Sequence, residues 1–302
     1  MNTIDAYEND ILMQIPFLLN TSFPKQLSIK KQQKAIFCGT GDSLAAALLA
    51  ESFSNNRVMV VDPLDLLKNT LIVKNKETYF VSISGKTISN IKASKLIKRT
   101  IAITSNKDSS LAKNCSKIIA LEYPHSGIFT SGSIGFLASA LTCISLVSKI
   151  RIHKIIDLFN KALIESKKVK LGKKIFILGN HHSYPIALYG AAKFYEVLGS
   201  SVQYCRIEQF LHMEIFSTRV GDTVIIFEEK NPHNLQIIKQ LKKLGLKVYR
   251  PSSGTMDKTS QVIFYTFFSQ LVPLSYAKKN RQKECFFVTA KKIRKVSSNM
   301  IY

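Results

Sequence analysis

The sequence is poor in cysteine and has none of the cysteine spacings that bind zinc or build a disulfide framework. Its 302 residues include five cysteines, which is an odd number without any C-x-x-C pair, and no tryptophan. We therefore expect buried free thiols in a reducing compartment, and predict a cytoplasmic protein. The cysteines are Cys38, Cys115, Cys143, Cys205 and Cys285.

The chain also lacks a hydrophobic run that could cross a membrane. Its longest apolar stretch, residues 134–147, contains Ser139, Thr142 and Ser145, and is too short and too polar to span a bilayer. The first ten residues carry three acidic side chains and no basic one, so we expect no secretory signal peptide. We therefore expect a buried helix over 134–147 and no membrane partner.

Acidic residues are scarce. The chain has 20 Asp and Glu against 43 Lys and Arg, so its formal net charge is +23. A basic surface binds phosphate without sequence preference, which raises the question of a nucleic-acid partner. The lysines are spread along the chain, however, and no helix-turn-helix, RNP or zinc-finger signature accompanies them. We predict no nucleic-acid partner, and expect the charge to attract small anionic substrates.

The sequence contains one structural plan twice. Each half begins with a short β-rich run, a glycine turn and a small-residue helix, and continues with a second strand and then a helix followed by a third strand. These segments are 35–51, 77–81 and 91–103 in the first half, and 174–193, 222–226 and 235–249 in the second.

Continuous apolar strands that alternate with helices indicate a parallel sheet covered on both faces. The predicted fold class is therefore α/β, with two tandem doubly wound domains related by duplication. The length of the chain and its 46% hydrophobic residues suffice for two cores. The predicted parts are an N-terminal helical segment over 1–33, a first domain over 34–150, a helical linker over 151–173, and a second domain with the C-terminal tail over 174–302.

The most informative motif is Ser-Ile-Ser-Gly-Lys-Thr at 82–87, which ends an apolar strand and precedes a predicted helix. It places three hydroxyl side chains and a glycine where the backbone N–H groups of the helix begin, and such a cluster suits an anion. The alternative is an ordinary turn capped by serine. Ligands of doubly wound folds bind at the carboxyl ends of the strands, where this loop and the glycine turn at 39–43 both fall. That position favours a phosphate site.

The Gly-x-Gly-x-Ser motif at 39–43, the Ser-x-Ser-Gly-x-Thr motif at 82–87 and the duplicated α/β unit resemble the sugar isomerase (SIS) domain family. The arrangement is most similar to the double-SIS isomerase half of glucosamine-6-phosphate synthase and to its stand-alone archaeal and bacterial relatives, from Lys34 to the C-terminus. The resemblance implies two flavodoxin-like SIS domains, a sugar-phosphate substrate and no cofactor.

The resemblance also implies that the loop at 82–87 holds the phosphate of the sugar. Ile83 departs from the family pattern, in which a polar residue is usual, but keeps its backbone N–H as a donor. Thr40 matches a hydroxyl that contacts the substrate, and the Ser/Thr segment at 130–133 matches one that lines the same pocket. The implied substrate-binding residues are Ser82, Ser84, Gly85, Thr87 and Thr40, with Ser131 and Ser133 as weaker candidates.

The stretch at 184–196 resembles the family's helix on which a Lys-x-x-Glu pair reaches the sugar. Lys193 and Glu196 are three residues apart and share one helix face. From this spacing alone, a solvent-facing ion pair is the ordinary interpretation, although the rest of the helix is nearly all apolar. The resemblance implies that Glu196 moves a proton between C1 and C2 while Lys193 stabilises the enediolate oxygens.

The resemblance adds two catalytic candidates. Glu208–His212 resembles a segment whose histidine assists ring opening in the neighbouring subunit's site, which implies a homodimer with a composite active site. Lys295 resembles a lysine of the tail that enters the active site, with Lys292 as the alternative. His181 and His182 lie in the second glycine turn without a suitably spaced carboxylate or cysteine, so we predict no metal.

The predicted function is a phosphosugar isomerase or deaminase that acts on a hexose or hexosamine 6-phosphate through an enediol(ate), with ammonia released by a deaminase. The identity of the sugar and of its C2 substituent stays open. No glutaminase domain or nucleophilic cysteine follows Met1, so glutamine-dependent amination is not expected.

The alternative is a non-catalytic regulatory protein that binds a sugar phosphate. Such regulators usually carry a helix-turn-helix domain, for which we expect no room in this chain.

Overall fold

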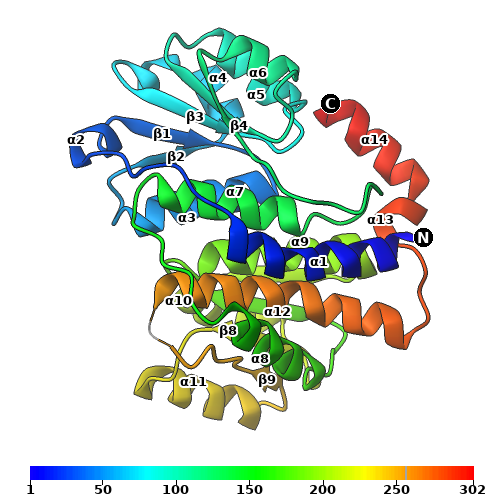
Figure 1. Cartoon of the computed structure of the whole chain (residues 1–302). Helices are drawn as coiled ribbons and strands as arrows, with labels where there is room; N and C mark the ends of the chain where they lie inside the picture. The colour runs from blue at the N-terminus through cyan, green and yellow to red at the C-terminus, as the bar shows by residue number, and fades with distance from the viewer. Residues whose placement is uncertain (256) are drawn as a thin grey trace. The chain divides into compact units, whose positions relative to one another are not determined.

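The computed structural model describes residues 1–255 and 257–302, and it contains two parallel β-sheets flanked by helices (Figure 1). The chain divides into two compact units, one around each sheet. The α/β fold with two tandem sheets is therefore confirmed. The first-sheet unit consists of Asn20–His125, Gly132–Ile150 and Ala290–Tyr302, and the second-sheet unit of Met1–Leu19, Ser126–Ser131 and Arg151–Thr289.

The first sheet has five parallel strands in the spatial order β2-β1-β3-β4-β5. Its central strands are short apolar runs that are buried along almost their whole length, as strands covered by helices on both faces must be. The strands are β1 (Ala35–Cys38), β2 (Met59–Val61), β3 (Glu77–Val81), β4 (Thr100–Thr104) and β5 (Lys117–Ala120).

The second sheet has four parallel strands in the order β7-β6-β8-β9. This repeats the order of the first four strands of the first sheet, because in both the first strand lies between the second and the third. It is the flavodoxin-like order, whose ligand site lies where the strand order reverses, outside the carboxyl ends of β1 and β3 or of β6 and β8. The strands are β6 (Ile175–Gly179), β7 (Val202–Cys205), β8 (Thr223–Phe227) and β9 (Lys247–Tyr249).

The turn after the first strand is built alike in both sheets. A Cβ atom on Gly39 would lie 2.8 Å from the backbone oxygen four residues later, and one on Gly179 would lie 2.7 Å from the corresponding oxygen. Two residues after each glycine the backbone has a positive φ, at Gly41 (56°) and at His181 (49°). The duplication seen in the sequence is therefore also visible in backbone geometry.

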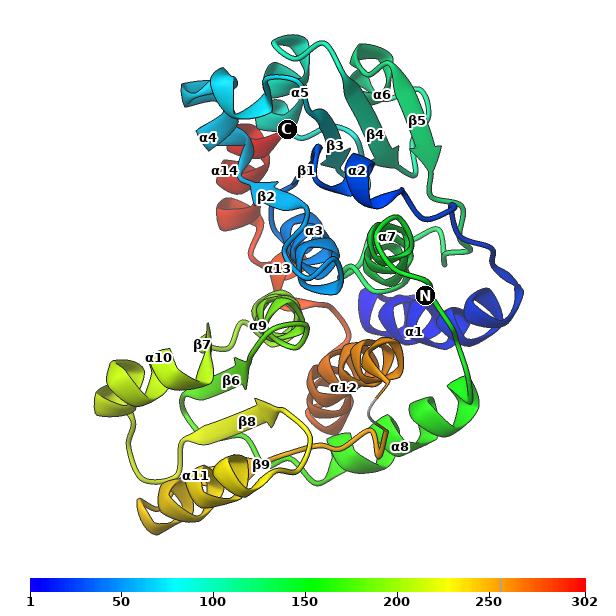
Figure 2. The ribbon, with the colours of Figure 1, turned by 90° about the vertical axis from the view of Figure 1, so that its left-hand side faces the viewer.

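In the first-sheet unit, α3 and α7 pack together on one face of the sheet, while α4, α5 and α6 cover the other face (Figure 2). All twelve residues of α7 are buried, as the apolar run at 134–147 predicts. The helices are α2 (Ile29–Gln32), α3 (Asp42–Phe53), α4 (Pro63–Lys68), η1 (Thr70–Val73), α5 (Ile88–Lys95), α6 (Ser110–Asn114), α7 (Ile134–Ser145) and α14 (Lys291–Ile301).

In the second-sheet unit, α9 and α12 cover one face of the sheet, and α10 and α11 cover the other (Figure 2). Helix α1 belongs to this unit, and so does α8, which packs against α12. The helices are α1 (Thr3–Asn20), α8 (Ile155–Lys167), α9 (Tyr184–Leu198), α10 (Ile207–His212), η2 (Glu214–Ser217), α11 (Pro232–Lys243), α12 (Lys258–Lys279) and α13 (Phe286–Thr289).

Helix α11 illustrates how local sequence sets these boundaries. The side chain of Asn231 caps its start by accepting a hydrogen bond from the backbone N–H of Asn234, at 2.8 Å. Pro232 follows at a first-turn position, where the missing N–H is harmless. Gly245 then ends the helix with a φ of 78°. Local sequence therefore sets both ends of α11.

The predicted N-terminal segment over 1–33 is divided between the two units after Leu19, whereas the predicted linker over 151–173 lies wholly in the second-sheet unit. Helix α8 lies within the predicted linker over 151–173, and α1 lies within the predicted N-terminal segment. The short segment Ser126–Ser131 belongs to the second-sheet unit, although both of its neighbouring segments belong to the first. The domain boundaries drawn from the sequence remain a proposal. Among the described residues, no helix has the length and apolarity that crossing a membrane requires.

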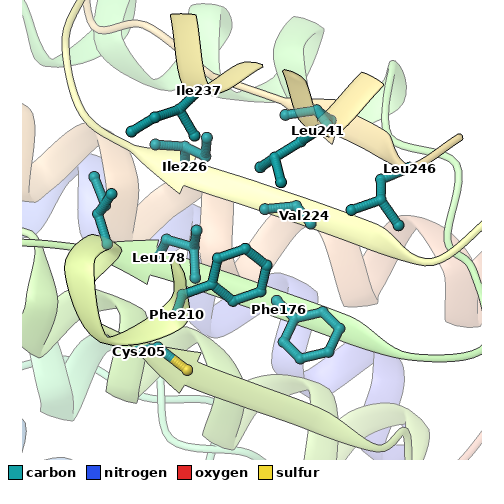
Figure 3. Close-up of a cluster of buried hydrophobic side chains, with 11 residues drawn as sticks. Phe176, Leu178, Cys205, Phe210, Val224, Ile226, Ile237, Leu241 and Leu246 are labelled. Carbon is teal, nitrogen blue, oxygen red and sulfur yellow. The ribbon is translucent and has the colours of Figure 1, made fainter. Parts of the chain in front are cut away.

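The core beneath α10 and α11 contains Phe176 and Leu178 from β6, with Val224 and Ile226 from β8 (Figure 3). These residues alternate along their strands, so all four point to the same face of the sheet. The ring of Phe210 on α10 meets that of Phe176 edge to face, at a centroid distance of 5.3 Å. This packing fixes α10 on the face of the sheet opposite α9.

We predict that Phe210→Ala lowers the free energy of unfolding by about 3–5 kcal/mol, because it empties a fully buried ring site. Urea unfolding followed by circular dichroism measures the loss. The matched control is Phe216→Ala, since Phe216 follows in η2 with 81% of its surface exposed and should change stability by less than about 0.5 kcal/mol. Equal effects of the two substitutions would contradict this description of the core.

Candidate functional site

The loop at 82–87, which we call the hydroxyl loop, joins the carboxyl end of β3 to α5. The hydroxyls of Ser82 and Thr87 lie 3.3 Å apart, and both side chains are buried. The hydroxyl of Ser84 accepts a hydrogen bond from the backbone N–H of Lys86 at 3.3 Å. The structure therefore brings the three predicted hydroxyl residues together at the start of a helix whose first turn holds no acidic side chain.

The backbone of the hydroxyl loop is fixed by neighbouring segments of the first-sheet unit. The carbonyl of Ile83 accepts hydrogen bonds from the hydroxyls of Thr104 and Ser105, at 3.0 and 2.8 Å. Gly85 has a φ of 63°, and a Cβ there would lie 2.1 Å from the hydroxyl oxygen of Ser109. Only glycine fits this position without displacing a neighbour. A loop held in this way presents its donors in a fixed arrangement, which suits an anion.

The first turn of α7 lies beside the hydroxyl loop. A Cβ on Gly135 would approach the side chain of Ile83 to 3.4 Å and the phenol oxygen of Tyr123 to 2.8 Å. Ser133 precedes α7 and is buried, and its hydroxyl has no hydrogen-bond partner among the described residues. A buried hydroxyl without a partner costs free energy unless a ligand or water satisfies it.

Thr40 lies in the turn between β1 and α3, half-buried between two glycines.

The second-sheet unit contains the other group of predicted residues. The Nζ of Lys193 lies 2.6 Å from Oε2 of Glu196 on the same face of α9. The hydroxyl of Ser131 donates to the same carboxylate oxygen, also at 2.6 Å. We call these three residues the ion-pair cluster. It shows that Ser131, a weaker candidate in the sequence, directly contacts the predicted base.

The ion-pair cluster is not the solvent-facing pair that its spacing alone indicates. The side chain of Lys193 is 0% exposed, whereas that of Glu196 is 34% exposed. The ammonium also lies over the ring of Tyr189, 4.9 Å from its centroid. Burying an ammonium costs free energy unless other groups compensate its lost hydration, and here a carboxylate and a ring do so. The carboxylate, by contrast, keeps a surface that a substrate can reach.

Neutral polar side chains surround the ion-pair cluster. The amide of Gln270 on α12 donates to the phenol oxygen of Tyr189 at 2.8 Å, and it exchanges hydrogen bonds with Gln14 of α1. Burial raises the pKa of Tyr7 well above its ordinary value; Tyr189 adds to this rise and Lys193 opposes it. The phenol of Tyr7 therefore stays protonated beside the ion pair.

The structure does not bring His212 to the ion-pair cluster of its own chain. His212 ends α10, which covers the face of the sheet opposite α9, and its side chain is 77% exposed. Its Nε2 lies 4.0 Å from Oε2 of Glu208, one turn earlier. Its role stays a prediction. Lys295 and Lys292 lie on α14, which has no buried residue and belongs to the first-sheet unit, and their roles stay predictions as well.

The turn after β6 corresponds to the turn after β1, but the chain's own carboxylate fills it. Oε1 of Glu228 accepts hydrogen bonds from the backbone N–H of Asn180, at 3.1 Å, and from the hydroxyl of Ser183, at 3.3 Å. Burial raises the pKa of Glu228, and these two hydrogen bonds oppose the rise. Glu228 follows β8, the strand that corresponds to β3, so the described residues after β8 present a carboxylate where the hydroxyl loop presents hydroxyls.

The adjacent histidines of this turn have separate surroundings. Nε2 of His182 lies 2.6 Å from the amide oxygen of Gln261, and burial lowers the pKa of His182 to about 4. His181 is the residue with positive φ in the turn. Over residues 1–255 and 257–302, no three His, Cys, Asp or Glu side chains are grouped so that they could hold a metal ion.

Sequence reasoning missed the residues that enclose the ion-pair cluster. Tyr189 could have been identified from the sequence, because it lies one turn before Lys193 on the same helix face. Tyr7 and Gln270 could not, since no sequence pattern links these distant segments to Lys193. Ser131 was found only as a general pocket residue, and its contact with Glu196 spans 65 positions of the chain.

We predict that Gly85→Ala weakens the binding of inorganic phosphate about tenfold or more, as expected when an anion site loses at least ~1.4 kcal/mol. The added Cβ meets Ser109 and strains a left-handed backbone, so the loop must shift. Isothermal titration calorimetry measures the affinity. Gly221→Ala is the matched control, because Gly221 also has a positive φ but open space around a Cβ. Unchanged phosphate affinity of Gly85→Ala would argue against an anion site here.

Comparison with known proteins shows the fold. Neither a protein-family model nor a curated protein matches the sequence. Among solved structures, glucosamine-6-phosphate deaminase from Thermotoga maritima is similar, with a TM-score of 0.68 and 17% identity, over 92% of this chain and 94% of that one.

Two further structures are also similar. A provisionally named phosphosugar isomerase from Clostridium difficile 630 has a TM-score of 0.72 and 17% identity, over 93% of each chain. Tagatose-6-phosphate ketose/aldose isomerase from Escherichia coli has a TM-score of 0.62 and 16% identity, over 90% of this chain and 88% of that one. The flavodoxin-like double-SIS fold, which the sequence motifs predict, is therefore confirmed: the chain has the fold of phosphosugar isomerases.

Proposed function

We propose that this protein is a phosphosugar isomerase or deaminase that acts on a hexose or hexosamine 6-phosphate. The observation that carries the proposal is the ion-pair cluster, in which a fully buried ammonium and a serine hydroxyl both bind one oxygen of a partly exposed carboxylate. A base that moves a proton on a substrate needs a fixed orientation and an open side, and Glu196 has both. Similar structures include a sugar-phosphate isomerase and an amino-sugar-phosphate deaminase, which supports this class of reaction.

In the proposed reaction, Glu196 removes the proton from C2 of the open-chain aldose. The electron pair of the C–H bond forms a C1=C2 double bond, and O1 takes up the negative charge of the enediolate. A proton passes from O2 to O1, and Glu196 returns the carbon-bound proton to C1, which gives the ketose with the same atoms. If C2 carries an amino group, the same enolisation leads to an imine at C2, which water hydrolyses with release of ammonia.

The charge of Lys193 is proposed to serve this step by orienting Glu196 and by stabilising the negative charge that develops on the sugar oxygens. Its complete burial and its 2.6 Å contact with Glu196 support the orienting role most directly. Contact of Lys193 with those oxygens, which the family resemblance implies, is part of the proposal.

The hydroxyl loop is proposed to hold the phosphate of the same sugar. Hydroxyl donors at the start of α5, the fixed backbone and the unpartnered hydroxyl of Ser133 beside Ile83 support this assignment. Ser84, Gly85 and Thr40 are proposed to complete the phosphate and substrate contacts.

Ring opening is proposed to involve His212 of a second copy and Lys295 of the tail. The high exposure of His212 leaves it accessible to another subunit. We therefore propose a homodimer with a composite active site.

The five free cysteines support a reducing location, for which we propose the cytoplasm.

We predict that Glu196→Gln lowers kcat for the interconversion of a hexose 6-phosphate by about 10²–10⁴-fold, the usual contribution of a general base. Glutamine keeps the oxygen that accepts from Ser131 and Lys193 but is not basic, so the cluster should stay folded. Product formation from glucosamine 6-phosphate, glucose 6-phosphate, mannose 6-phosphate and fructose 6-phosphate measures activity, and calorimetry measures binding.

The control is Glu122→Gln, which removes a carboxylate from an exposed ion pair with Lys107 and should leave kcat unchanged. Equal turnover by wild type and Glu196→Gln would show that Glu196 is not the base. Binding of these sugars by the wild type without any turnover would favour the non-catalytic regulatory function instead.

We predict that Ser82→Ala raises KM for the sugar phosphate about tenfold with little change in kcat, because a phosphate contact far from C1 and C2 binds ground state and transition state alike. Steady-state kinetics separates the two constants. Ser116→Ala is the control, since Ser116 lies at the amino end of β5, away from the carboxyl ends of the strands. A fall in kcat at constant KM would contradict a phosphate-binding role for Ser82.

A further inference from the structure

Helix α1 is bound at its first turn to two distant segments of the second-sheet unit. The hydroxyl of Thr3 donates to Oε2 of Glu284 at 2.6 Å and accepts from the backbone N–H of Cys285 at 2.7 Å. The backbone N–H of Ile4 donates to the carbonyl of Lys283 at 3.1 Å. The start of the chain is therefore fixed on the loop that follows α12.

The second of these segments is Ser126–Ser131, the part of the middle of the chain that belongs to this unit. The hydroxyl of Thr130 donates to the backbone carbonyl of Thr3 at 2.7 Å. The backbone N–H of Ser126 donates to Oδ1 of Asp10, about two turns further along α1, also at 2.7 Å. Both ends of the segment are therefore attached to the same helix.

The residue after Thr130 is Ser131, whose hydroxyl donates to Oε2 of Glu196 at 2.6 Å. A serine side chain is short, so the position of its hydroxyl is set by its backbone and one rotatable bond. The hydrogen bond from Thr130 to α1 fixes that backbone at the preceding residue. The hydroxyl of Ser131 thus donates to Glu196 from a position that depends on α1, the first helix of the chain.

We propose that Thr130 is a positioning residue, which holds Ser131 against the carboxylate of Glu196 through its hydrogen bond to the first turn of α1. This inference rests on the proposed function only in that Glu196 is taken as the base. Thr130 does not touch the substrate or the reacting atoms. It acts by keeping the second donor of the carboxylate in place, so that the base is oriented by Lys193 and Ser131 together.

Losing Thr130's hydroxyl has a specific consequence for the acid–base chemistry. A base that loses one of two contacts is less well oriented. We therefore expect a lower kcat. The KM should change little, because the hydroxyl loop contains none of these residues.

The test is Thr130→Val, which keeps the shape of the side chain and removes its hydroxyl, compared with Thr130→Ser, which keeps the hydroxyl. We expect Thr130→Val to lower kcat about 10–100-fold, as small displacements of catalytic groups do, and Thr130→Ser to retain most of it. Thr218→Val is the matched control, because Thr218 also donates its hydroxyl to a backbone carbonyl, that of Ile215 at 2.7 Å, but outside the cluster.

A crystal structure of Thr130→Val supplies a readout that does not depend on turnover. We expect the distance from the hydroxyl of Ser131 to Oε2 of Glu196 to exceed 3.5 Å in this variant and to stay near 2.6 Å in Thr130→Ser. A retained bond, or equal loss of kcat in Thr130→Val and Thr218→Val, would overturn the proposal. If the wild type turns over no sugar phosphate, the proposed function fails while the distance still decides the role of Thr130.

Discussion

The packing of the second-sheet unit depends on the buried ammonium of Lys193. Removing such a charge from water costs several kcal/mol, so it persists only where surrounding groups compensate the lost hydration. Glu196 supplies the opposite charge and Tyr189 a ring face, and the polar chain through Gln270 to Gln14 holds that ring. Because these partners come from α1, α9 and α12, the charge is tolerated only when all three helices are in place. The requirement for charge compensation and the requirement for an oriented base are met by the same contacts.

The duplicated units differ most at the positions where their sheets could bind an anion. The backbone of the two turns is alike, down to the glycine at the strand end and the positive φ two residues later. In the second sheet, Glu228 already occupies the donors of Asn180 and Ser183. In the first sheet, the candidate anion site lies instead in the hydroxyl loop after β3, whereas β8, the corresponding strand of the second sheet, is followed by Glu228. The two units therefore share the geometry of the turn after their first strand but differ in the side chains that follow β3 and β8, which are hydroxyls in one unit and a carboxylate in the other.

How far the sequence predicted the structure depends on the range of the contacts concerned. The strands, the glycine turns and the hydroxyl loop follow from runs of a few residues, because apolar alternation with helices and a left-handed Gly85 are local properties. The same holds for Lys193 and Glu196, which share a helix face. That Lys193 is buried could not be predicted from spacing, since the residues that cover it lie elsewhere in the sequence. The bond from Thr130 to Thr3 spans 127 positions, and no local pattern distinguishes either residue from an ordinary surface threonine.

The long-range bonds also explain how α1 affects Ser131, beyond the contacts that its own side chains make around the ion-pair cluster. A segment of six residues would be free to move if only its own backbone restrained it, and ordering each residue costs about 1–2 kcal/mol of conformational entropy. Attachment to Thr3 at one end and to Asp10 at the other meets that cost when α1 folds onto the unit, before any ligand arrives. Ser131 is then already directed at Glu196, and substrate binding need not supply the energy to order it. The first helix of the chain thus contributes preorganisation to the proposed base, although the base itself lies nearly two hundred residues further along.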